Sequence, residues 1–511
     1  MTRQHILMLC AMGAYMLVML LVGVWYARRN KTADDYYLGG RKLSPLVAAM
    51  SAEASDMSSW LLMGLPGLAY LSGVSEAAWT AIGLAVGTYI NWLVVARRMR
   101  RYTVVANNSI TIPDFFSNRF HDKSRLLMSA SAIIILIFFV PYTASGFAAC
   151  GKLFGTIFGM EYLPAMLVSA LVLVLYTAIG GFLAASFTDL IQSILMSVAL
   201  IVVLIFGVVT AGGFGAVIDN ANSMPGFLNI FENYLPASNT SEPYGFLTIV
   251  STLAWGLGYF GMPHILLRFM AINDEKKLKQ SRRIASIWVV ISLGVAICIG
   301  VVGAAALKGA FSTSAESETI FIRIAEMLGR NGVFPALFAG VILAGILAAT
   351  MSTADSQLLV ASSSVSQNFY KGLIRKKASN KEVMWVSRIT IVVIAVIAAV
   401  IALDPNSSIF EIVSFAWAGF GAAFGPLVLF ALFWKRTTTA GAFAGMISGG
   451  AMVFIWKFLL NPLGGIWAIY ELLTAFVLAC VVTVAVSLLT KKPSAEIEAE
   501  FDLVASGEPV E

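Results

Sequence analysis

Charged residues are scarce in this 511-residue chain: 12% of its residues are charged, whereas 59% are hydrophobic. A soluble domain carries roughly 25% charged residues, so lipid must solvate most of this chain. Cysteine and histidine are scarce too, at four and three residues, and no CxxC spacing occurs. We therefore expect an integral membrane protein with neither a disulfide framework nor a cysteine-based metal site.

Enzyme signatures are absent as well. The chain has no GxxxxGK[ST] phosphate loop, no HExxH pattern and no soluble nucleotide-binding half of the kind that an ATP-driven pump needs. Any uphill transport must therefore draw on an ion gradient. One sodium ion moving inward through ~100 mV supplies about 2.3 kcal/mol, and a tenfold concentration gradient adds ~1.4 kcal/mol. Together these terms support accumulation of a solute by several hundredfold.

Long apolar runs make up most of the chain. A run of about 20 apolar residues crosses a bilayer, and we predict about thirteen spans: 5–28, 45–72, 75–97, 125–157, 162–184, 188–213, 243–270, 282–308, 320–368, 384–404, 408–434, 438–460 and 466–490. The run 320–368 is too long for one perpendicular helix and should begin with an extracellular amphipathic portion, TIFIRIAEMLGR. The first run follows Arg3 as a signal peptide would, but it lacks a small-residue cleavage site, so we expect it to be retained.

Basic residues cluster in alternate loops, which predicts the orientation. The clusters are Arg28, Arg29, Lys31, Arg41 and Lys42; Arg97, Arg98, Arg100 and Arg101; Lys276, Lys277, Lys279, Arg282 and Arg283; Lys371, Arg375, Lys376 and Lys377; Lys435 and Arg436; and Lys491 and Lys492. By the positive-inside rule these loops are cytoplasmic, which places the N-terminus outside and the C-terminus inside a plasma (inner) membrane. The net charge of +6 therefore reflects loop asymmetry and no nucleic-acid partner. The acidic tail AEIEAEFDLVASGEPVE is expected to be disordered.

The segment ASDMSSWLLMGLPG, residues 54–67, places polar and helix-breaking residues inside a membrane span. In hydrocarbon every backbone N–H and C=O must be satisfied internally, so an interrupted helix persists only where it is buried in protein or lines a watery cavity. Ion and solute sites of secondary transporters are built in this way. Composition and periodicity alone thus indicate a multi-span transporter or a channel.

Several longer motifs carry a resemblance to a known family: SAEASDMSSWLLMGLPG (51–67), YTAIGGFLAASFTDLIQ (176–192), WGLGYFGMPHILLRFM (255–270), AGILAATMSTADSQLLVASS (344–363) and FAWAGFGAAFGPLVLF (415–430). Over nearly its whole length the chain resembles the sodium/solute symporter family, and within it the carriers of L-proline. The resemblance implies an all-α membrane fold with a five-plus-five inverted repeat of the leucine-transporter type. It implies repeats at 45–213 and 243–434, a first span within 1–44, an extracellular loop at 214–242, two accessory spans within 435–490 and a cytoplasmic tail at 491–511.

A sodium site with two halves follows from the same resemblance. Sodium is a hard cation, and membrane proteins bind it with carbonyls of unwound helices and with hydroxyls. One half would be the hydroxyls of Ser352 and Thr353 with the carbonyl of Ala349, and the other half the carbonyls of Ala54 and Met57. The alternative is that the two hydroxyls only bond back to carbonyls of their own helix.

Charged residues near these motifs each have two interpretations. An uncompensated charge such as Asp56, inside the break, costs roughly 2.5–3.5 kcal/mol, so it either supports sodium dependence or caps a half-helix. Glu53 lies near the same depth and is either protonated or paired with an unidentified partner. Asp189 is either the N-cap of the sixth span or, by resemblance, a residue of sodium coupling. Arg41, in GGRKLS, either sets topology or, by resemblance, takes part in gating.

Aromatic residues indicate where the organic substrate binds. Trp255 and Tyr259 are spaced i, i+4 in a helix that glycines and Pro263 make irregular, which predicts one shared face; simple packing is the alternative. The resemblance adds Tyr142 to the same cavity. Aromatic faces suit the pyrrolidine ring and the ammonium of proline, while exposed N–H groups at the break, around Ser58 and Trp60, attract its carboxylate.

These observations predict a symporter that imports L-proline with sodium by alternating access, in contact with the lipid bilayer. The same fold could carry another solute, such as pantothenate or a different amino or carboxylic acid. A transporter-like sensor and a passive channel are further alternatives. Uptake against a gradient separates symport from a channel, and robust turnover separates it from a sensor.

Overall fold

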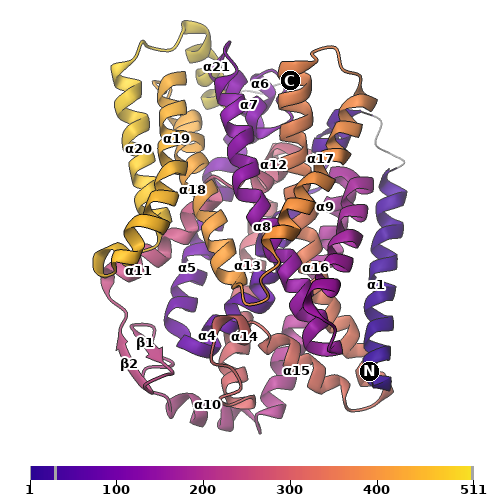
Figure 1. Cartoon of the computed structure of the whole chain (residues 1–511). Helices are drawn as coiled ribbons and strands as arrows, with labels where there is room; N and C mark the ends of the chain where they lie inside the picture. Colours follow the sequence, from indigo (N-terminus) through magenta and orange to yellow (C-terminus); the bar gives the residue numbers. More distant parts are fainter. Residues whose placement is uncertain (1, 28–31, 508–511) are drawn as a thin grey trace.

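The computed structural model describes residues 2–27 and 32–507. Within them the chain is a bundle of long helices, with one small hairpin of two strands at one end (Figure 1). Arg28, Arg29 and Lys31, on which the predicted orientation partly depends, lie outside the described residues, as does the end of the acidic tail.

The helices and strands have the following bounds: α1 Arg3–Ala27, α2 Ala33–Leu38, α3 Pro45–Ser59, α4 Leu65–Ser72, α5 Val74–Ile90, α6 Ala96–Val105, α7 Ile112–Arg119, α8 Leu126–Phe158, α9 Tyr162–Thr210, α10 Phe214–Asn222, β1 Glu232–Leu235, β2 Thr240–Pro243, α11 Phe246–Leu253, α12 Pro263–Ala271, α13 Leu278–Ala306, α14 Ser314–Ser317, α15 Ile320–Gly329, α16 Val333–Ser363, α17 Asn380–Ile401, α18 Ile409–Phe433, α19 Thr439–Ile455, α20 Glu471–Leu489 and α21 Ala495–Ser506. A tight 3-10 segment, Ala254–Phe260, joins α11 to α12, and a wider π-type segment, Ser364–Ile374, extends α16. Strands β1 and β2 pair antiparallel, with Glu232 opposite Pro243.

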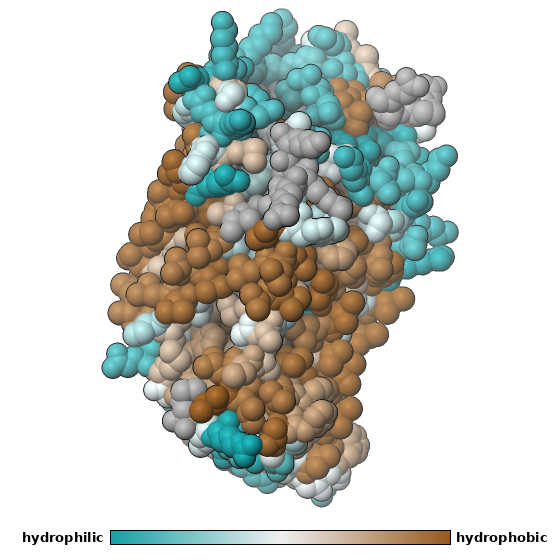
Figure 2. Space-filling model, turned by 90° about the vertical axis from the view of Figure 1, so that its right-hand side faces the viewer, coloured by the Kyte–Doolittle hydropathy of each residue, from teal (hydrophilic) through white to brown (hydrophobic). Residues whose placement is uncertain are grey.

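Ten helices in the described part are long and apolar enough to cross a membrane. Counting Phe246–Phe260 and Pro263–Ala271, which are bent by 45°, as one further span makes eleven. The predicted count of thirteen is not confirmed, because Tyr162–Ala178 is short and 45–72 is interrupted. The run 320–368 is divided into α15 and α16, as its length predicted. Figure 2 shows hydrophobic residues covering the middle of the molecule and hydrophilic residues gathered at its ends.

Two long helical stretches contain a residue with non-helical backbone angles. In α3 it is Ser58, with φ 49° and ψ −170°, and in α9 it is Gly181, with φ 72° and ψ −177°. The break at Gly181 lies three residues before the predicted end of the fifth span, 162–184, and the sixth span follows it within α9. The break at Ser58 confirms the interrupted span that residues 54–67 predicted. Because α3 packs against α9, α12, α13 and α16, its interrupted backbone is enclosed by protein.

Glycine lets α5 approach the 3-10 segment at backbone distance. A Cβ atom added at Gly87 would lie 2.4 Å from the carbonyl oxygen of Gly256, and one added at Gly256 would lie 2.2 Å from the carbonyl oxygen of Gly83. Such distances are shorter than any real Cβ contact, so this approach requires glycine at both positions. The contact fixes the 3-10 segment, and with it Trp255, against α5.

The acidic tail is not disordered as expected, because residues 495–506 form α21. Ser494 caps this helix by accepting a hydrogen bond from the N–H of Ile497. Ile497, Phe501 and Val504 are buried on one face, and α21 packs against α6. Overall acidity concealed an apolar stripe at i, i+4 and i+7, which is enough to hold a short amphipathic helix on a neighbour.

The two ends of the bundle differ. Figure 1 places α6, α7 and α21 at the end that carries the C-terminus, and α10, α14, α15 and the β-hairpin at the end that carries the N-terminus. The four arginines of the second basic cluster lie in α6. The hairpin end contains most of the loop 214–242, which was expected to be extracellular.

Candidate functional site

The predicted halves of the sodium site meet where α3 is broken. The hydroxyl of Ser352, on α16, donates a hydrogen bond to the carbonyl oxygen of Ala54 at 2.8 Å and lies 3.1 Å from that of Ala349. Thr353 is buried beside it, and its hydroxyl has no hydrogen-bond partner within the described ranges 2–27 and 32–507. Ser352 thus does more than bond back to its own helix. Thr353 thus has a buried hydroxyl that no described residue satisfies, and it follows directly after Ser352, whose own hydroxyl lies within reach of two carbonyls; a cation would complete such a set.

Met57 supplies the carbonyl at the break itself. Its oxygen accepts the N–H of Trp60, and this N–H also lies 3.1 Å from the Ser58 hydroxyl, which accepts from it. The predicted ligands are therefore all oxygens, from carbonyls and hydroxyls. Among the described residues no group of three or more His, Cys, Asp or Glu is placed to hold a metal ion. An all-oxygen, uncharged set suits a hard monovalent cation.

Asp56 is the centre of a hydrogen-bonded cluster of aromatic residues. The Tyr259 hydroxyl donates to Asp56 Oδ2 at 2.5 Å, and the Tyr142 hydroxyl donates to the Asp56 carbonyl oxygen at 3.1 Å. All three residues are buried. In the part of the chain that the structure describes, no backbone N–H bonds the Asp56 carboxylate, so the cap interpretation has no contact to support it. Tyr142 and Tyr259, which were predicted to bind the substrate, are instead hydrogen-bonded to Asp56, which was predicted to couple sodium.

The partner that the sequence did not identify for Glu53 is Trp92. The indole N–H of Trp92 donates to Glu53 Oε1 at 3.1 Å. The second carboxyl oxygen, Oε2, is buried with no partner in the described residues. Trp92 follows α5, so this bond joins α5 to α3 one turn before the break.

Asp189 is not an N-cap, because it lies well inside α9, beyond the break at Gly181. It is fully buried and forms an ion pair with Arg268, whose Nη2 lies 3.1 Å from Asp189 Oδ2. The Ser51 hydroxyl donates to the same oxygen at 2.6 Å, and Arg268 Nη2 donates to the Ser356 hydroxyl at 2.6 Å. These contacts link α3, α9, α12 and α16.

Sequence reasoning missed Arg268 as a member of this cluster. Its signal was nevertheless present: an arginine within the apolar helix PHILLRFMA needs a partner, since an unpaired charge at membrane depth costs several kcal/mol. Several carboxylates lie within other apolar helices, and only the folded chain shows that Asp189 is the one with which Arg268 pairs.

Trp255 and Tyr259 lie in a 3-10 segment and not in the α-helix that the i, i+4 spacing assumed, so the predicted shared face does not follow from that spacing. Trp255 contacts Trp60 and Phe410, with ring centroids 5.6 and 5.5 Å apart. Tyr259 turns toward Asp56 and packs edge-on to Trp417 at 5.1 Å. Pro263 begins α12 in the first turn, a position that needs no N–H donor. Trp255 thus contacts Trp60 after the break, and Tyr259 contacts Asp56 before it.

Arg41 contacts residues of α6 and α12. It donates to the Met270 carbonyl at 2.7 Å, to the Ser109 carbonyl at 2.9 Å and to the Thr103 hydroxyl and Asn108 side chain at 3.2 Å each. Burial and the neighbouring Arg100 lower the pKa of Arg41 to about 10, so it stays protonated at neutral pH. A charged side chain with four acceptors holds several segments together, which agrees with either predicted role.

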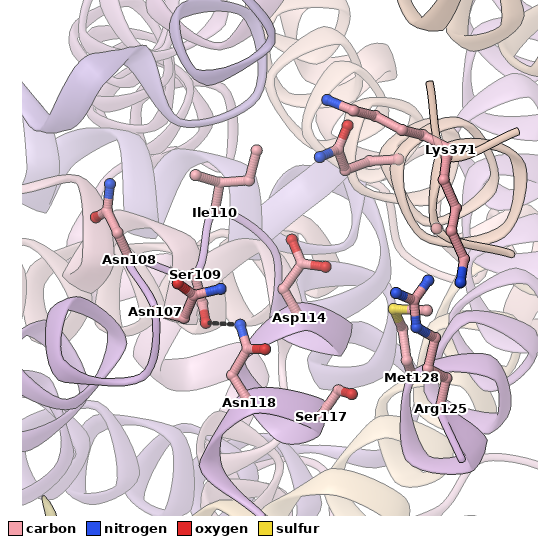
Figure 3. A pocket seen from close by; sticks show the side chains of 13 residues that line it. Asn107, Asn108, Ser109, Ile110, Asp114, Ser117, Asn118, Arg125, Met128 and Lys371 are labelled. Carbon is pink, nitrogen blue, oxygen red and sulfur yellow. Dashed lines mark hydrogen bonds between the residues drawn. The ribbon is translucent and has the colours of Figure 1, made fainter. Parts of the chain in front are cut away.

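A polar cavity of about 420 Å³ lies beside the partners of Arg41 (Figure 3). Asn118 donates to the Ser109 hydroxyl on its wall at 2.9 Å. Asp114, one turn before Asn118 on α7, accepts a hydrogen bond from Asn368 at 2.5 Å, which joins α7 to the segment after α16. Burial raises the pKa of Asp114 to about 6, although bonds from Thr111 and Asn368 and the charge of Lys371 oppose this.

Comparison with solved structures defines the fold. The chain superposes on a Na⁺-coupled sialic acid symporter in a substrate-bound, outward-open state with a TM-score of 0.77, at 20% identity, covering 96% of this chain and 99% of that one. It matches MhsT in complex with L-phenylalanine with a TM-score of 0.54, at 15% identity, covering 88% of this chain and 98% of that one. The fold is the all-α, five-plus-five inverted repeat of leucine-transporter type.

Sequence comparison then gives the family. The model of the sodium:solute symporter family matches residues 36–449. Relatives called sodium/proline symporter are 44% identical over 500 residues in Escherichia coli K12 (97% of this chain, 95% of the relative) and 46% identical over 497 residues in Haemophilus influenzae (96% and 95%). One from Staphylococcus aureus is 42% identical over 498 residues (96% and 94%). The chain belongs to the sodium:solute symporter family; it is a transporter and not an enzyme.

Proposed function

We propose that this chain imports L-proline together with sodium by alternating access. The observation that carries the proposal is the hydrogen bond from Ser352 of α16 to the Ala54 carbonyl of the broken α3, with the Thr353 hydroxyl, unpartnered among the described residues, at the next position. Three relatives called sodium/proline symporter, each aligned over nearly its whole length, support both the ion and the solute.

Sodium binds, in this proposal, between the carbonyls of Ala54, Met57 and Ala349 and the hydroxyls of Ser352 and Thr353. Entry of the ion would redirect the Ser352 hydroxyl from its present acceptor, Ala54, and satisfy the Thr353 oxygen. Because the ligands come from both α3 and α16, sodium would favour the conformation in which these two helices are close. Such differential binding is what couples an ion to a conformational change.

Proline binds next to the same break. Trp60 and Trp255 offer aromatic faces for the pyrrolidine ring and the secondary ammonium, and Tyr142 and Tyr259 line the opposite side. Backbone N–H groups around Ser58 would receive the carboxylate. Asp56 and Asp189 are the proposed residues of sodium coupling, and Arg41 is the proposed gating residue on the cytoplasmic side.

The proposed setting is a plasma (inner) membrane with the N-terminus outside and the C-terminus in the cytoplasm. The arginines of α6, at the end that carries α21, support this orientation. The repeats at 45–213 and 243–434, the loop 214–242, the accessory spans within 435–490 and the tail 491–511 remain the proposed divisions of the chain.

Uptake into proteoliposomes tests the function. With sodium outside and an inside-negative potential, labelled L-proline should accumulate well above its external concentration, and it should only equilibrate without the sodium gradient. Equilibration under both conditions would indicate a channel, and binding without uptake would indicate a sensor. A panel of unlabelled solutes, including pantothenate and other amino acids, checks the substrate. If another solute competes more strongly and is itself accumulated, the proline assignment is wrong while sodium symport stands.

A further inference from the structure

The polar cavity of about 420 Å³ that Figure 3 shows has an excess of positive charge on its wall. Three of its lining side chains are basic and one is acidic: Arg125, just before α8; Lys371, in the segment Ser364–Ile374; Lys376, just after that segment; and Asp114, on α7. The basic side chains come from two parts of the chain that are far apart in sequence. Such a wall attracts an anion.

The three basic side chains are not neutralised by the protein. Within residues 2–27 and 32–507, Arg125, Lys371 and Lys376 form no ion pair. Their neighbour Arg375 does form one, with Glu382 at 3.1 Å. Membrane topology accounts for many basic residues at one end of the bundle. It does not account for unpaired ones from two separate segments that line the same cavity.

A tight turn places Arg125 on the cavity wall. Its φ of 57° and ψ of 22° are left-handed, which is uncommon for a residue other than glycine. Asp122 holds the turn, because its carboxylate accepts the N–H of Ser124 at 3.1 Å and that of Leu127 at 2.8 Å. A Cβ atom added at Gly372 would lie 3.7 Å from Arg125 Nη1. The guanidinium therefore reaches the backbone beside Lys371.

Amide side chains supply further hydrogen-bonding groups to the cavity: Asn107, Asn108, Asn118 and Gln367. The Oε1 atom of Gln367 is buried and has no hydrogen-bond partner in the described part of the chain. An amide offers either its oxygen or its NH₂ group to a ligand, depending on how it is turned. The cavity volume lies within the range of small-molecule pockets, roughly 300–1,000 Å³. It can therefore hold an anion together with an organic group.

The balance of charge indicates which anion fits. Asp114 offsets one of the three positive charges, so a charge of about two is left to neutralise. A phosphate monoester carries about −1.5 to −2 at neutral pH and has three strong acceptor oxygens. Arginine binds such a group with two parallel hydrogen bonds, and lysine binds it as a point charge. A carboxylate carries only one negative charge and would leave the cavity positive.

We infer that this cavity binds a phosphate monoester group, carried either by a small soluble molecule or by the headgroup of the lipid phosphatidate. The phosphate would face Arg125, Lys371 and Lys376. Because the segment Ser364–Ile374 continues α16, the bound group would join the helix that carries Ser352 and Thr353 to the turn before α8. The ligand is neither proline nor sodium, so the inference goes beyond the proposed function and its test needs neither of them.

Equilibrium binding of labelled inorganic phosphate to the purified full-length protein, in a neutral detergent with chloride as the background salt, tests the site. The wild type should bind a single phosphate per chain in a saturable manner. Arg125→Gln and Lys371→Gln should each weaken binding by roughly tenfold or more, because a charge-assisted hydrogen bond is lost. Lys279→Gln and Lys492→Gln, which remove exposed charges outside the cavity, should leave the affinity unchanged.

Asp114→Asn gives a test in the opposite direction. It removes the negative charge of the cavity wall, so it should strengthen phosphate binding several-fold. This variant keeps the inference testable even if the loss of Arg125 or Lys371 prevents folding. Unchanged or weaker binding by Asp114→Asn would overturn the site. Absence of saturable binding by the wild type, or an equal loss in the two control variants, would overturn it as well.

Competition against the labelled phosphate identifies the source of the group. The competitors are sn-glycerol 3-phosphate and a short-chain phosphatidate below its micelle concentration, which carry the same headgroup without and with acyl chains. Displacement at a much lower concentration of phosphatidate would identify a lipid site. Displacement at least as strong by glycerol phosphate would identify a soluble ligand. If neither displaces the label, the cavity does not accept a phosphate monoester and the inference is wrong.

Discussion

The Tyr259 hydroxyl donates a hydrogen bond to Asp56 Oδ2 at 2.5 Å, so a residue assigned to the solute directly contacts a residue assigned to the ion. The two come from different halves of the predicted repeat, at 45–213 and 243–434. A change in the charge or position of Asp56 must therefore reach the aromatic cluster through this bond. Because coupling between two binding sites is reciprocal, proline should likewise alter the affinity for sodium.

Ser352→Ala and Thr353→Ala should each raise the sodium concentration for half-maximal proline uptake. Loss of one ligand oxygen costs on the order of 1–3 kcal/mol, or roughly tenfold to a hundredfold in affinity. Sodium titration of uptake in proteoliposomes measures the effect. Ser363→Ala is the matched control, because this hydroxyl on the same helix donates to the Val360 carbonyl. Unchanged sodium dependence in both test variants would remove the pair from the site.

Asp56→Asn keeps the shape of the side chain and removes its charge. If that charge contributes to sodium affinity, uptake should collapse at low sodium and recover only in part at high sodium. Tyr259→Phe removes the hydrogen bond and leaves the carboxylate, which separates the two contributions. A wild-type sodium titration for Asp56→Asn would show that the residue has a structural role only.

Trp255→Ala and Tyr259→Ala should weaken proline far more than sodium. Aromatic packing and cation–π contacts contribute ~0.5–2 kcal/mol each, which predicts a several-fold to thirtyfold rise in the apparent KM for proline. The KM for proline should be measured at saturating sodium, and surface expression should be checked separately. Trp385→Ala is a suitable control, because this indole is exposed on the outside of the bundle. Normal proline KM in both variants would argue against a proline pocket here.

Arg268→Gln should destabilise the protein strongly, because it leaves the Asp189 carboxylate buried without its ion pair. Removal of one partner of a buried pair costs about 3–5 kcal/mol. The double variant Arg268→Gln with Asp189→Asn should recover much of this loss, since no charge of the pair remains. Thermal unfolding in detergent of the single and double variants provides the comparison. Additive losses would mean that the two residues do not stabilise one another.

Asp114 should make the contact between α7 and residues 364–374 sensitive to pH. Burial raises the pKa of Asp114 to about 6, so folding favours its protonated form. The stabilisation is therefore fully present below the ordinary carboxyl pKa of about 4 and is lost as the pH rises through about 6. Asp114→Asn should gain thermal stability relative to the wild type between pH 5 and 8. Parallel melting profiles across that range would contradict this expectation, and Asp219→Asn, in α10, serves as a control.

The parts of the structure that depend on a single segment could be predicted from the local sequence. The break in α3 was predictable because Asp56, Ser58 and the residues after it interrupt an apolar run, and α15 was predictable from the length of 320–368. What could not be predicted depends on contacts between distant segments. Arg268 meets Asp189 across helices, and Trp92 meets Glu53 from the next span. The choice of a 3-10 segment over an α-helix around Trp255 follows the close approach of Gly87 and Gly256, which no local pattern shows.

The aromatic cluster also has an optical consequence. Trp255 lies 5.6 Å from Trp60 and 6.3 Å from Trp417 between ring centroids, so three of the eleven tryptophans form one continuous group of indoles. Electronic transitions of rings this close interact, and the group should dominate the near-ultraviolet circular dichroism of the folded protein. A solute that enters beside Trp255 changes the environment of all three rings at once. The chain therefore contains its own spectroscopic reporter of occupancy, with no dye or label attached.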